Sequence, residues 1–359
     1  MKSKKHILIL TPGFPNSEAD TTCIPALQIL IKELHKRHHD KLLIDVVSVH
    51  YPFTKGNYTW NEISCWSAGG KNRGFPFKIL TWLQLLIYVF RLHFKNPVDV
   101  IHTFWLHDCS MLGSIFSWLT GARLIVHCMG QDVRKPNKYI PFIRFKKNIV
   151  ISNSSFTAAT LLENFKIKTD FIIPFGINPD DFLDTSNPQK KIDLLAVGSL
   201  TDLKNHKLFI EIFELLKIDF PTLTGSIIGG GPLHNELQEL IFKKGLQDSL
   251  ILEGEKKRDV VLDRMAVSKI LIHTSAFESA GYVFLEALQS KMAVISFKTG
   301  FLPEVKGAYQ CSGKDEMIKC ARKLLAENTL YEIPVLPLIA DAADKILEIY
   351  SQEYRMLSS

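Results

Sequence analysis

The sequence contains no Cys-x-x-Cys pair, no Asp-x-Asp and no uninterrupted apolar run long enough to span a bilayer. Its six cysteines are scattered, which is typical of reduced thiols in a cytoplasmic protein and argues against a disulfide framework or a zinc site. No internal repeat or low-complexity segment is present. The first ten residues carry three lysines and a short apolar run. A secretory signal has a longer apolar core, so a first buried strand is expected here.

Composition places the chain among ordinary globular proteins, with 359 residues, 46% hydrophobic and 22% charged. This length is sufficient for two domains with a core in each. The net charge of +6 is uneven, because residues 1–180 carry +10 and the remainder −4. Two interpretations stay open: a solvated basic surface, or an N-terminal half that faces an anionic membrane or a phosphorylated acceptor. The acidic second half and the lack of a binding motif exclude a nucleic-acid partner.

The first half alternates apolar runs with amphipathic segments, a pattern that predicts a parallel sheet covered by helices. Strands are expected at 6–10, 42–49, 98–103, 124–128 and 148–152, and helices at 24–38, 78–95, 111–120 and 155–164. Residues 51–77 interleave aromatics with Gly, Asn and Lys, and are expected to form a long irregular loop.

The segment 78–95 is the most apolar of these helices. Its core, 79–92, is shorter than the roughly 20 residues that span a bilayer, so a buried domain helix is expected. The alternative is a helix that lies on a membrane surface, with Trp82 and Tyr88 as anchors beside the flanking basic residues.

The stretch 270–288 is expected to carry the chemistry. An apolar run at 270–272 predicts a buried strand, a polar loop follows, and a helical pattern begins after Gly281. Glu278 lies in the loop and Glu286 eight residues later, about two turns into the helix. Loops at the carboxyl ends of parallel strands are where such sheets bind ligands, and a first helical turn favours an anion.

A second strand is expected at 293–297, followed by the segment TGFLPEV at 299–305. This order of strand, acidic loop, helix, strand and Gly-x-x-Pro-Glu-Val resembles the donor-sugar site of family-4 retaining glycosyltransferases of the GT-B fold. The resemblance implies an α/β protein with two Rossmann-like domains facing across a cleft. It places an acceptor-side domain at 1–178 and a donor-binding domain at 192–337, with a linker between them. A C-terminal helix, about 338–359, is expected to cross back to the first domain.

Further motifs carry the same resemblance. HCMGQD at 127–132 is similar to the family's His-Gly-x-Asp segment, with two residues inserted before the glycine. The turn GGGP at 229–232 resembles a Gly-x-Gly-Pro turn, and Pro174-Phe175-Gly176 resembles the family's interdomain hinge. Lys204 stands at a position whose lysine contacts the donor diphosphate in the family, whereas Ser199 replaces an arginine that does so.

The resemblance assigns roles to individual residues. Glu286 would bind the two ribose hydroxyls, Glu278 would face the transferred sugar, and Lys204 would stabilise the leaving diphosphate. The implied catalytic residues are Glu278, His127 and Lys204. The implied substrate-binding residues are Glu286, Ser279, Ala280, Gly281, Tyr282, Gly13, Ser199, Gly230 and Asp132.

The expected activity is transfer of a hexose from a UDP- or GDP-linked sugar to a glycan or lipid-linked acceptor, with retention. No metal is expected, because the chain lacks Asp-x-Asp, and no cofactor is expected. The resemblance is to enzymes of bacterial polysaccharide or lipopolysaccharide synthesis, in the cytoplasm or at the inner membrane face. Two alternatives stay open: a nucleotide-sugar epimerase of the same fold, and a non-catalytic nucleotide-sugar-binding scaffold, which the missing cation at Ser199 favours.

Overall fold

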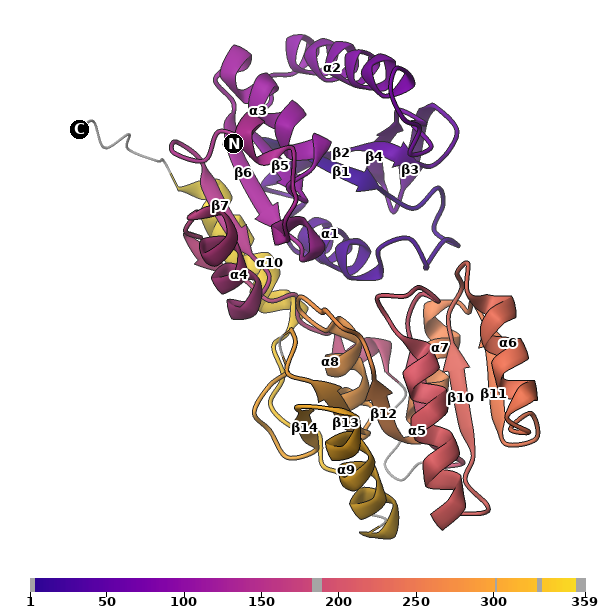
Figure 1. Ribbon diagram of the computed structural model, residues 1–359. Helices are drawn as coiled ribbons and strands as arrows, with labels where there is room; N and C mark the ends of the chain where they lie inside the picture. The colour runs from indigo at the N-terminus through magenta and orange to yellow at the C-terminus, as the bar shows by residue number, and fades with distance from the viewer. Residues whose placement is uncertain (1–3, 183–188, 301, 328–330, 353–359) are drawn as a thin grey trace. The chain divides into compact units, whose positions relative to one another are not determined.

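The computed structural model describes residues 4–182, 189–300, 302–327 and 331–352. The chain divides into two compact units: unit 1 consists of residues 1–175 with 338–359, and unit 2 of residues 176–337. Each unit is a sheet of mainly parallel strands with helices on its faces (Figure 1). Unit 2 begins at Gly176, inside the Pro-Phe-Gly segment that the sequence marks as a hinge. Of the expected linker, 183–188 lie outside the described residues, as does Phe301 of the TGFLPEV segment.

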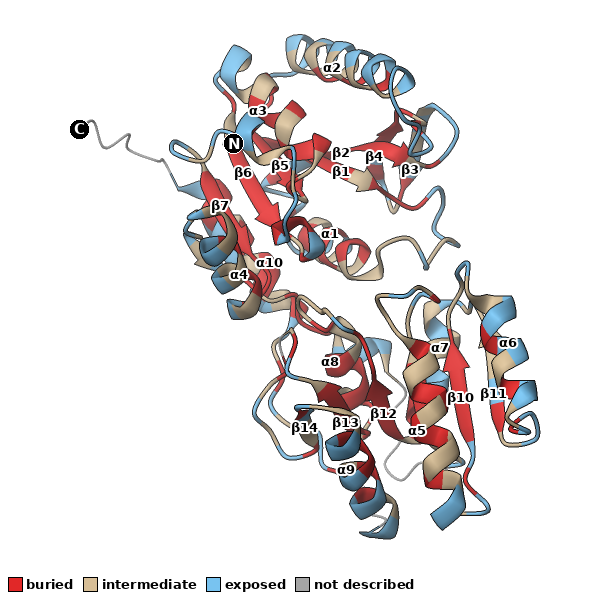
Figure 2. Cartoon of the chain, in the orientation of Figure 1, coloured by how far each residue is buried: buried red, intermediate tan, exposed pale blue. Residues whose placement is uncertain are grey.

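Unit 1 contains an eight-stranded sheet with the order β3-β4-β2-β1-β5-β6-β7-β8, in which only the β3–β4 pair is antiparallel. Its strands are β1 (Lys5–Gly13), β2 (Leu42–Tyr51), β3 (Gly56–Trp60), β4 (Ile63–Ser67), β5 (Val100–Phe104), β6 (Arg123–Cys128), β7 (Ile149–Ser152) and β8 (Phe171–Ile172). The central strands are buried along nearly their whole length, which explains why they appear in the sequence as continuous apolar runs (Figure 2).

Helices connect these strands. They are α1 (Pro25–His38), α2 (Phe77–Lys95), α3 (Asp108–Thr120) and α4 (Ser155–Phe165), with the short 3₁₀ turns η1 (Gln131–Val133) and η2 (Ile140–Phe142). Leu27, Leu30, Ile31 and Leu34 form the buried face of α1, at the three- and four-residue spacing seen in the sequence.

The expectation of an irregular loop at 51–77 is wrong for the middle part of this segment. Residues 56–67 form the hairpin β3–β4, which adds β4 to the sheet beside β2. The hairpin turns through Asn61 and Glu62, both with positive φ. A two-residue turn with positive φ at both positions matches the right-handed twist of the two strands that it connects.

The expected burial of the helix at 78–95 is also wrong. Only Thr81, Leu85 and Val89 of α2 are buried. In Figure 2 most of α2 is coloured as intermediate or exposed. By length and composition α2 could cross a membrane, and 17% of that window is buried. The sequence established the apolarity of this helix but not which side of it the domain covers.

The expected return of the final helix to the N-terminal domain is confirmed. Helix α10 (Ile339–Ser351) packs against α1 within unit 1 (Figure 1). Asp344 forms an ion pair with Arg37 at 2.7 Å, and His38 Nε2 lies 2.9 Å from the same carboxylate. The Tyr350 carbonyl accepts a hydrogen bond from Lys5 Nζ at 2.8 Å. The part of the expected helix beyond residue 352 lies outside the described residues.

Unit 2 contains a six-stranded, all-parallel sheet of order β11-β10-β9-β12-β13-β14. Its strands are β9 (Ile192–Val197), β10 (Gly225–Ile228), β11 (Leu250–Gly254), β12 (Ser268–His273), β13 (Ala293–Phe297) and β14 (Ala308–Cys311); its helices are α5 (His206–Asp219), α6 (His234–Lys243), α7 (Arg258–Ala266), α8 (Tyr282–Gln289) and α9 (Lys314–Glu327). Counted along the chain, this is the 3-2-1-4-5-6 order of a Rossmann fold.

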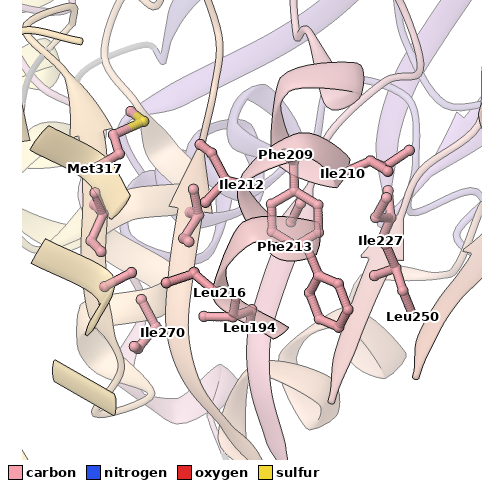
Figure 3. Close-up of a cluster of buried hydrophobic side chains, with 14 of the residues drawn as sticks. Leu194, Phe209, Ile210, Ile212, Phe213, Leu216, Ile227, Leu250, Ile270 and Met317 are labelled. Carbon is pink, nitrogen blue, oxygen red and sulfur yellow. The ribbon is translucent and has the colours of Figure 1, made fainter. Parts of the chain in front are cut away.

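The core on one side of this sheet is aliphatic and aromatic. Phe209 and Phe213 of α5 pack with Leu194, Ile227 and Leu250 of the strands beneath (Figure 3). Gly225 belongs to this contact, because a Cβ there would lie 2.5 Å from the Phe213 ring. Helix α5 therefore packs directly on the sheet. This packing positions the loop that precedes α5.

Candidate functional site

In the parallel sheet of unit 2 the order of strand addition reverses between β9 and β12. Successive strands run outward on one side from β9 to β11, and on the other from β12 to β14. The loops that leave the carboxyl ends of β9 and β12 therefore diverge at this point. In open α/β sheets this divergence is where ligands bind. Both loops carry residues that the sequence marked, Lys204 in the first and Glu278 in the second.

Hydrogen bonds join these two loops. The Ala276 N–H donates to the Leu203 carbonyl at 3.0 Å. The Thr274 hydroxyl contacts the carbonyls of Lys204 and Asn205 at 3.0 and 2.9 Å. These contacts fix the backbone of both loops, so the side chains above them have a defined spacing.

Lys204, Glu278 and His273 form a charged cluster at this point. The Lys204 ammonium and the His273 Nε2–H both donate to Oε2 of Glu278, at 2.5 and 3.0 Å. Burial raises the pKa of Glu278, but the hydrogen bond from His273 and the charge of Lys204 outweigh it and lower the pKa to about 2. Burial lowers the pKa of His273 below 6.5 against the opposing effect of Glu278. At neutral pH the carboxylate of Glu278 is thus ionised and the imidazole of His273 uncharged.

The segment after β13 positions Glu278. The Glu278 N–H donates to the Thr299 hydroxyl at 2.8 Å. Gly300 has a φ of +71°, and a Cβ there would approach the Glu278 Cβ to 3.0 Å. This segment, which the sequence singled out as TGFLPEV, therefore supports the acidic loop through its first two residues.

Gly281 starts α8 with left-handed backbone, at a φ of +56°. Gly281, at the N-cap position of this helix, has no side chain that could cap it. Helix α8 begins at Tyr282 and has eight residues. Glu286 is its fifth residue and lies little more than one turn from its start. The expected placement about two turns into the helix is wrong. Ser279, Ala280 and Tyr282 are half-buried around this helix start.

Glu286 has a partner that sequence reasoning missed. Arg258, at the start of α7, donates from Nε to Oε1 of Glu286 at 3.0 Å and from Nη1 to Asp181 at 2.7 Å. Burial raises the pKa of Glu286, and Arg258 opposes this shift. No hydrogen bond to Oε2 of Glu286 is found within the described part of the chain, so that oxygen can accept one from a ligand hydroxyl.

The sequence did hold a signal for Arg258. A basic residue in the first turn of a helix faces the positive end of the helix dipole, where acids are preferred. A nearby carboxylate offsets this unfavourable interaction, and here Glu286 and Asp181 both do so.

The glycine-rich turn lies beside the β9 loop. A Cβ on Gly229 would lie 1.9 Å from the Gly198 carbonyl oxygen, so both segments approach as closely as bare backbone allows. The Gly230 carbonyl accepts from the Leu200 N–H at 2.8 Å. Ser199, which lies between Gly198 and Leu200 in the β9 loop, is exposed. The structure therefore brings the predicted residues Ser199 and Gly230 near the Lys204 loop, and it gives the glycines a packing role.

The remaining predicted residues belong to unit 1. Gly13 is buried at the end of β1, where the sheet of unit 1 diverges between β1 and β5. Asp132 accepts hydrogen bonds from the N–H groups of Leu106, Met129 and Gly130. Burial raises the pKa of Asp132 despite these bonds. Asp132 thus stabilises the loop after β6, a role that its sequence context did not specify.

His127, at the end of β6, is fully buried among the rings of Phe104, Phe175 and His102. Its Nδ1 lies 3.3 Å from Nε2 of His102, and its Nε2 has no hydrogen-bond partner within the described residues. Burial lowers the pKa of His127 to about 3. The imidazole is therefore neutral at physiological pH, and its Nε2 is buried without a hydrogen-bond partner among the described residues.

The described residues include no group of three or more His, Cys, Asp or Glu that could hold a metal ion. The unit 2 site offers instead a cation, two carboxylates and an uncapped helix start. This combination is suited to an anion beside a polyhydroxylated group.

Comparison with known proteins places these residues in a family context. Residues 177–314 match the family model described as glycosyl transferases group 1. The phosphatidylinositol N-acetylglucosaminyltransferase gpi3 subunit of Schizosaccharomyces pombe is 28% identical over 47% of this chain and 38% of its own length. An uncharacterized glycosyltransferase of Methanocaldococcus jannaschii is 25% identical over 71% of this chain and 69% of its own. The chain thus spans little more than a third of the first of these relatives.

Solved structures agree in fold over nearly the whole chain. Anabaena Alr3699/HepE, solved in complex with UDP, has a TM-score of 0.66 at 16% identity and covers 96% of this chain and 95% of its own. Sucrose-phosphate synthase from Thermosynechococcus elongatus has a TM-score of 0.72 at 13% identity, covering 97% and 95%. The chain has the GT-B fold of these proteins, and within it residues 177–314 match the glycosyl transferases group 1 family.

Proposed function

We propose that this protein is a glycosyltransferase that moves a hexose-type sugar from a nucleoside-diphosphate sugar to a hydroxyl of a glycan or lipid-linked acceptor. One observation carries the proposal: the Lys204–Glu278–His273 cluster lies at the strand divergence of the unit that matches the glycosyl transferases group 1 family. The structure of Alr3699/HepE with UDP supports a nucleotide donor for a chain of this fold.

In this reaction the C1–O bond breaks, and the nucleoside diphosphate leaves with the bonding electrons. Negative charge therefore grows on the β-phosphate, where the Lys204 ammonium and the first-turn N–H groups of α8 would stabilise it. The acceptor oxygen forms the new bond to C1, and its proton passes to an oxygen of the departing phosphate. The proposed mechanism uses no metal and proceeds with retention.

Glu278 and Glu286 have separate roles in this proposal. Glu278 accepts hydrogen bonds from both Lys204 and His273, so the bond from His273 would keep it ionised when the ammonium turns to the donor phosphate. Its carboxylate then faces the sugar hydroxyls. Glu286, fixed through Oε1 by Arg258, would accept from the ribose through Oε2.

The test begins with the donor. A thermal-shift panel of nucleoside diphosphates and their sugars, with and without EDTA, identifies the base and sugar that stabilise the protein. The stabilising donor is then used to compare Lys204→Ala with Lys207→Ala, a matched control whose ammonium pairs with Glu236 of α6. Loss of a preorganised charge at the leaving group predicts a turnover roughly 10²–10³-fold lower for Lys204→Ala, with the control unchanged.

The proposal fails if Lys204→Ala and Glu286→Gln both keep wild-type donor affinity and turnover. Product analysis separates the two alternatives. An epimerase would release free sugar and nucleotide without any acceptor. A non-catalytic scaffold, which the exposed serine at position 199 favours, would bind the donor and turn over none in an acceptor screen.

A further inference from the structure

Helix α2 presents apolar side chains on the side away from its domain. Phe77, Leu80, Leu83, Ile87 and Phe94 are 51–82% exposed. The spacing of Leu80, Leu83, Ile87 and Phe94 puts these four on one helical face, opposite the buried Thr81, Leu85 and Val89, and Phe77 lies at the N-terminal end of the helix. Isolated exposed apolar residues are ordinary, but a continuous apolar stripe of this length marks an interaction surface.

The stripe is framed by positive charge alone. Residues 63–98 contain no aspartate or glutamate, and they contain five basic residues: Lys71, Arg73, Lys78, Arg91 and Lys95. All of these except Lys78 are exposed. An apolar face between exposed cations is complementary to a surface with acyl chains below and anionic groups above.

A second basic segment belongs to the same unit. Residues 133–162 also lack acidic side chains and carry six basic ones, at positions 134, 135, 138, 144, 146 and 147. Lys78 Nζ donates to the Tyr139 hydroxyl at 2.7 Å, so this segment lies at the start of α2. Beside it are the exposed Phe142 and Trp118, the latter with the Arg144 guanidinium at 5.9 Å from its ring.

Contacts of the opposite face keep α2 attached to unit 1. The Trp82 indole N–H donates to the buried Asp108 carboxylate at 3.2 Å, and Lys78 pairs with the same carboxylate at 3.1 Å. Tyr88 stacks on Trp66 with ring centroids 4.2 Å apart. A helix that crossed a bilayer would have to break all of these contacts and leave Asp108 with fewer partners. The geometry therefore favours a helix lying in the plane of a membrane surface.

We propose that α2, with the basic segment 134–147, docks unit 1 onto an anionic lipid bilayer. The exposed apolar stripe enters the boundary between headgroups and acyl chains, and the flanking lysines and arginines contact lipid phosphates. This inference concerns a surface remote in sequence from the donor residues, and it stands whether or not the proposed transferase activity is correct.

The experiment is flotation of the whole protein with phosphatidylcholine vesicles, with and without phosphatidylglycerol, at low and high salt. We expect binding to the anionic vesicles that weakens as salt is raised. Replacing Lys71, Arg73, Arg91 and Lys95 with glutamine is expected to lower the partition coefficient by about fivefold per charge. Replacing Leu80, Leu83 and Ile87 with serine is expected to lower it about tenfold or more.

A matched control is available on unit 2, where Ile218 and Phe242 are each 73% exposed. Their serine variants remove similar apolar area elsewhere and are expected to bind vesicles as the wild type does. Circular dichroism and thermal midpoints verify that every variant is folded.

Several outcomes would overturn the proposal. Equal binding to neutral and anionic vesicles, no binding to either, or equal losses in the unit 2 control would show that this surface is not a lipid-docking site. Resistance to alkaline carbonate extraction would show that α2 spans the bilayer instead. Binding to a protein partner through the same residues, with none to vesicles, would assign the surface to another kind of interaction.

Discussion

His127 is one member of a chain of three buried polar groups in unit 1. Tyr350 contacts His102 Nδ1 at 2.7 Å, and His102 Nε2 contacts His127 Nδ1 at 3.3 Å. When the Tyr350 hydroxyl donates to His102 Nδ1, His102 donates from Nε2 to His127 Nδ1, and His127 carries its proton on Nε2. The tautomer of His127 is thus coupled to a tyrosine of α10.

The buried imidazole of His127 has a consequence for stability against pH. In the unfolded chain a histidine binds a proton near pH 6.5, whereas in the folded protein the pKa of His127 is about 3. Between these values the unfolded state binds more protons, so the free energy of unfolding falls as pH is lowered from 6.5 towards 3.

We expect His127→Gln to lower the slope of the free energy of unfolding by about 1 kcal/mol per pH unit between pH 5 and 6. Urea unfolding curves at closely spaced pH values measure this slope. If wild type and variant have the same slope, His127 is not held neutral in the folded protein.

The residues that sequence reasoning located were those that belong to recognisable local motifs. Lys204, Glu278 and Gly281 each lie in a loop between a strand and a helix, and the structure places them at one divergence of the sheet. Arg258 was missed because its carboxylate partners, Asp181 and Glu286, are 77 and 28 residues away along the chain. Pairing over such separations is set by the order of strands, which no local pattern contains.

At the scale of elements, the start of α8 depends on Gly281. Its φ of +56° is costly for other residues, and a Cβ there would lie 2.2 Å from the Phe284 ring. We expect Gly281→Ala to reduce the free energy of unfolding of unit 2 by more than about 1 kcal/mol. It should also weaken binding of the donor that the thermal-shift panel identifies, because the first-turn N–H groups move.

Gly313→Ala is the matched control for this element. Gly313 directly precedes α9, and a Cβ there would meet nothing within 4 Å. Thermal unfolding and donor titration of both variants measure the expected losses of stability and of donor affinity. Equal stability of the two variants would show that the left-handed start of α8 carries no constraint.

Apolar periodicity predicted the elements whose burial follows a simple pattern. Strands β1, β5, β6 and β13 and helices α1 and α4 were expected close to where they lie. The hairpin β3–β4 was missed because its first strand alternates exposed and intermediate residues and carries Gly and Asn. Helix α2 was assigned to the core because hydrophobicity reports apolar area, whereas burial depends on what packs against it.

At the scale of the molecule, unit 2 is a continuous segment inserted into unit 1. Its two ends are adjacent, since the Ile177 N–H donates to the Pro337 carbonyl at 3.0 Å. We expect residues 176–337, produced alone, to unfold in one cooperative transition and to be stabilised by the same nucleoside diphosphate as the full chain. Calorimetry of this segment with and without nucleotide is the measurement. A segment without a cooperative transition would show that unit 2 depends on unit 1.

The division into units was only partly accessible to sequence. Alternation of strands and helices in the first half predicted one parallel sheet, whereas the second Rossmann-like domain and the final helix were expected from family resemblance. The resemblance also implied the return of that helix to the N-terminal domain, but not that it packs on α1. The contacts of Asp344 with Arg37 and His38, more than 300 residues away, leave no local trace in the sequence.

The insertion also sets an order of events during translation. Unit 2 is complete once residue 337 has left the ribosome, whereas unit 1 still lacks α10 and its contacts with Lys5, Arg37 and His102. Domains generally fold as units while the chain is being made. Unit 1 can therefore complete its fold only after α10 has emerged, although its apolar helix α2 is synthesised much earlier.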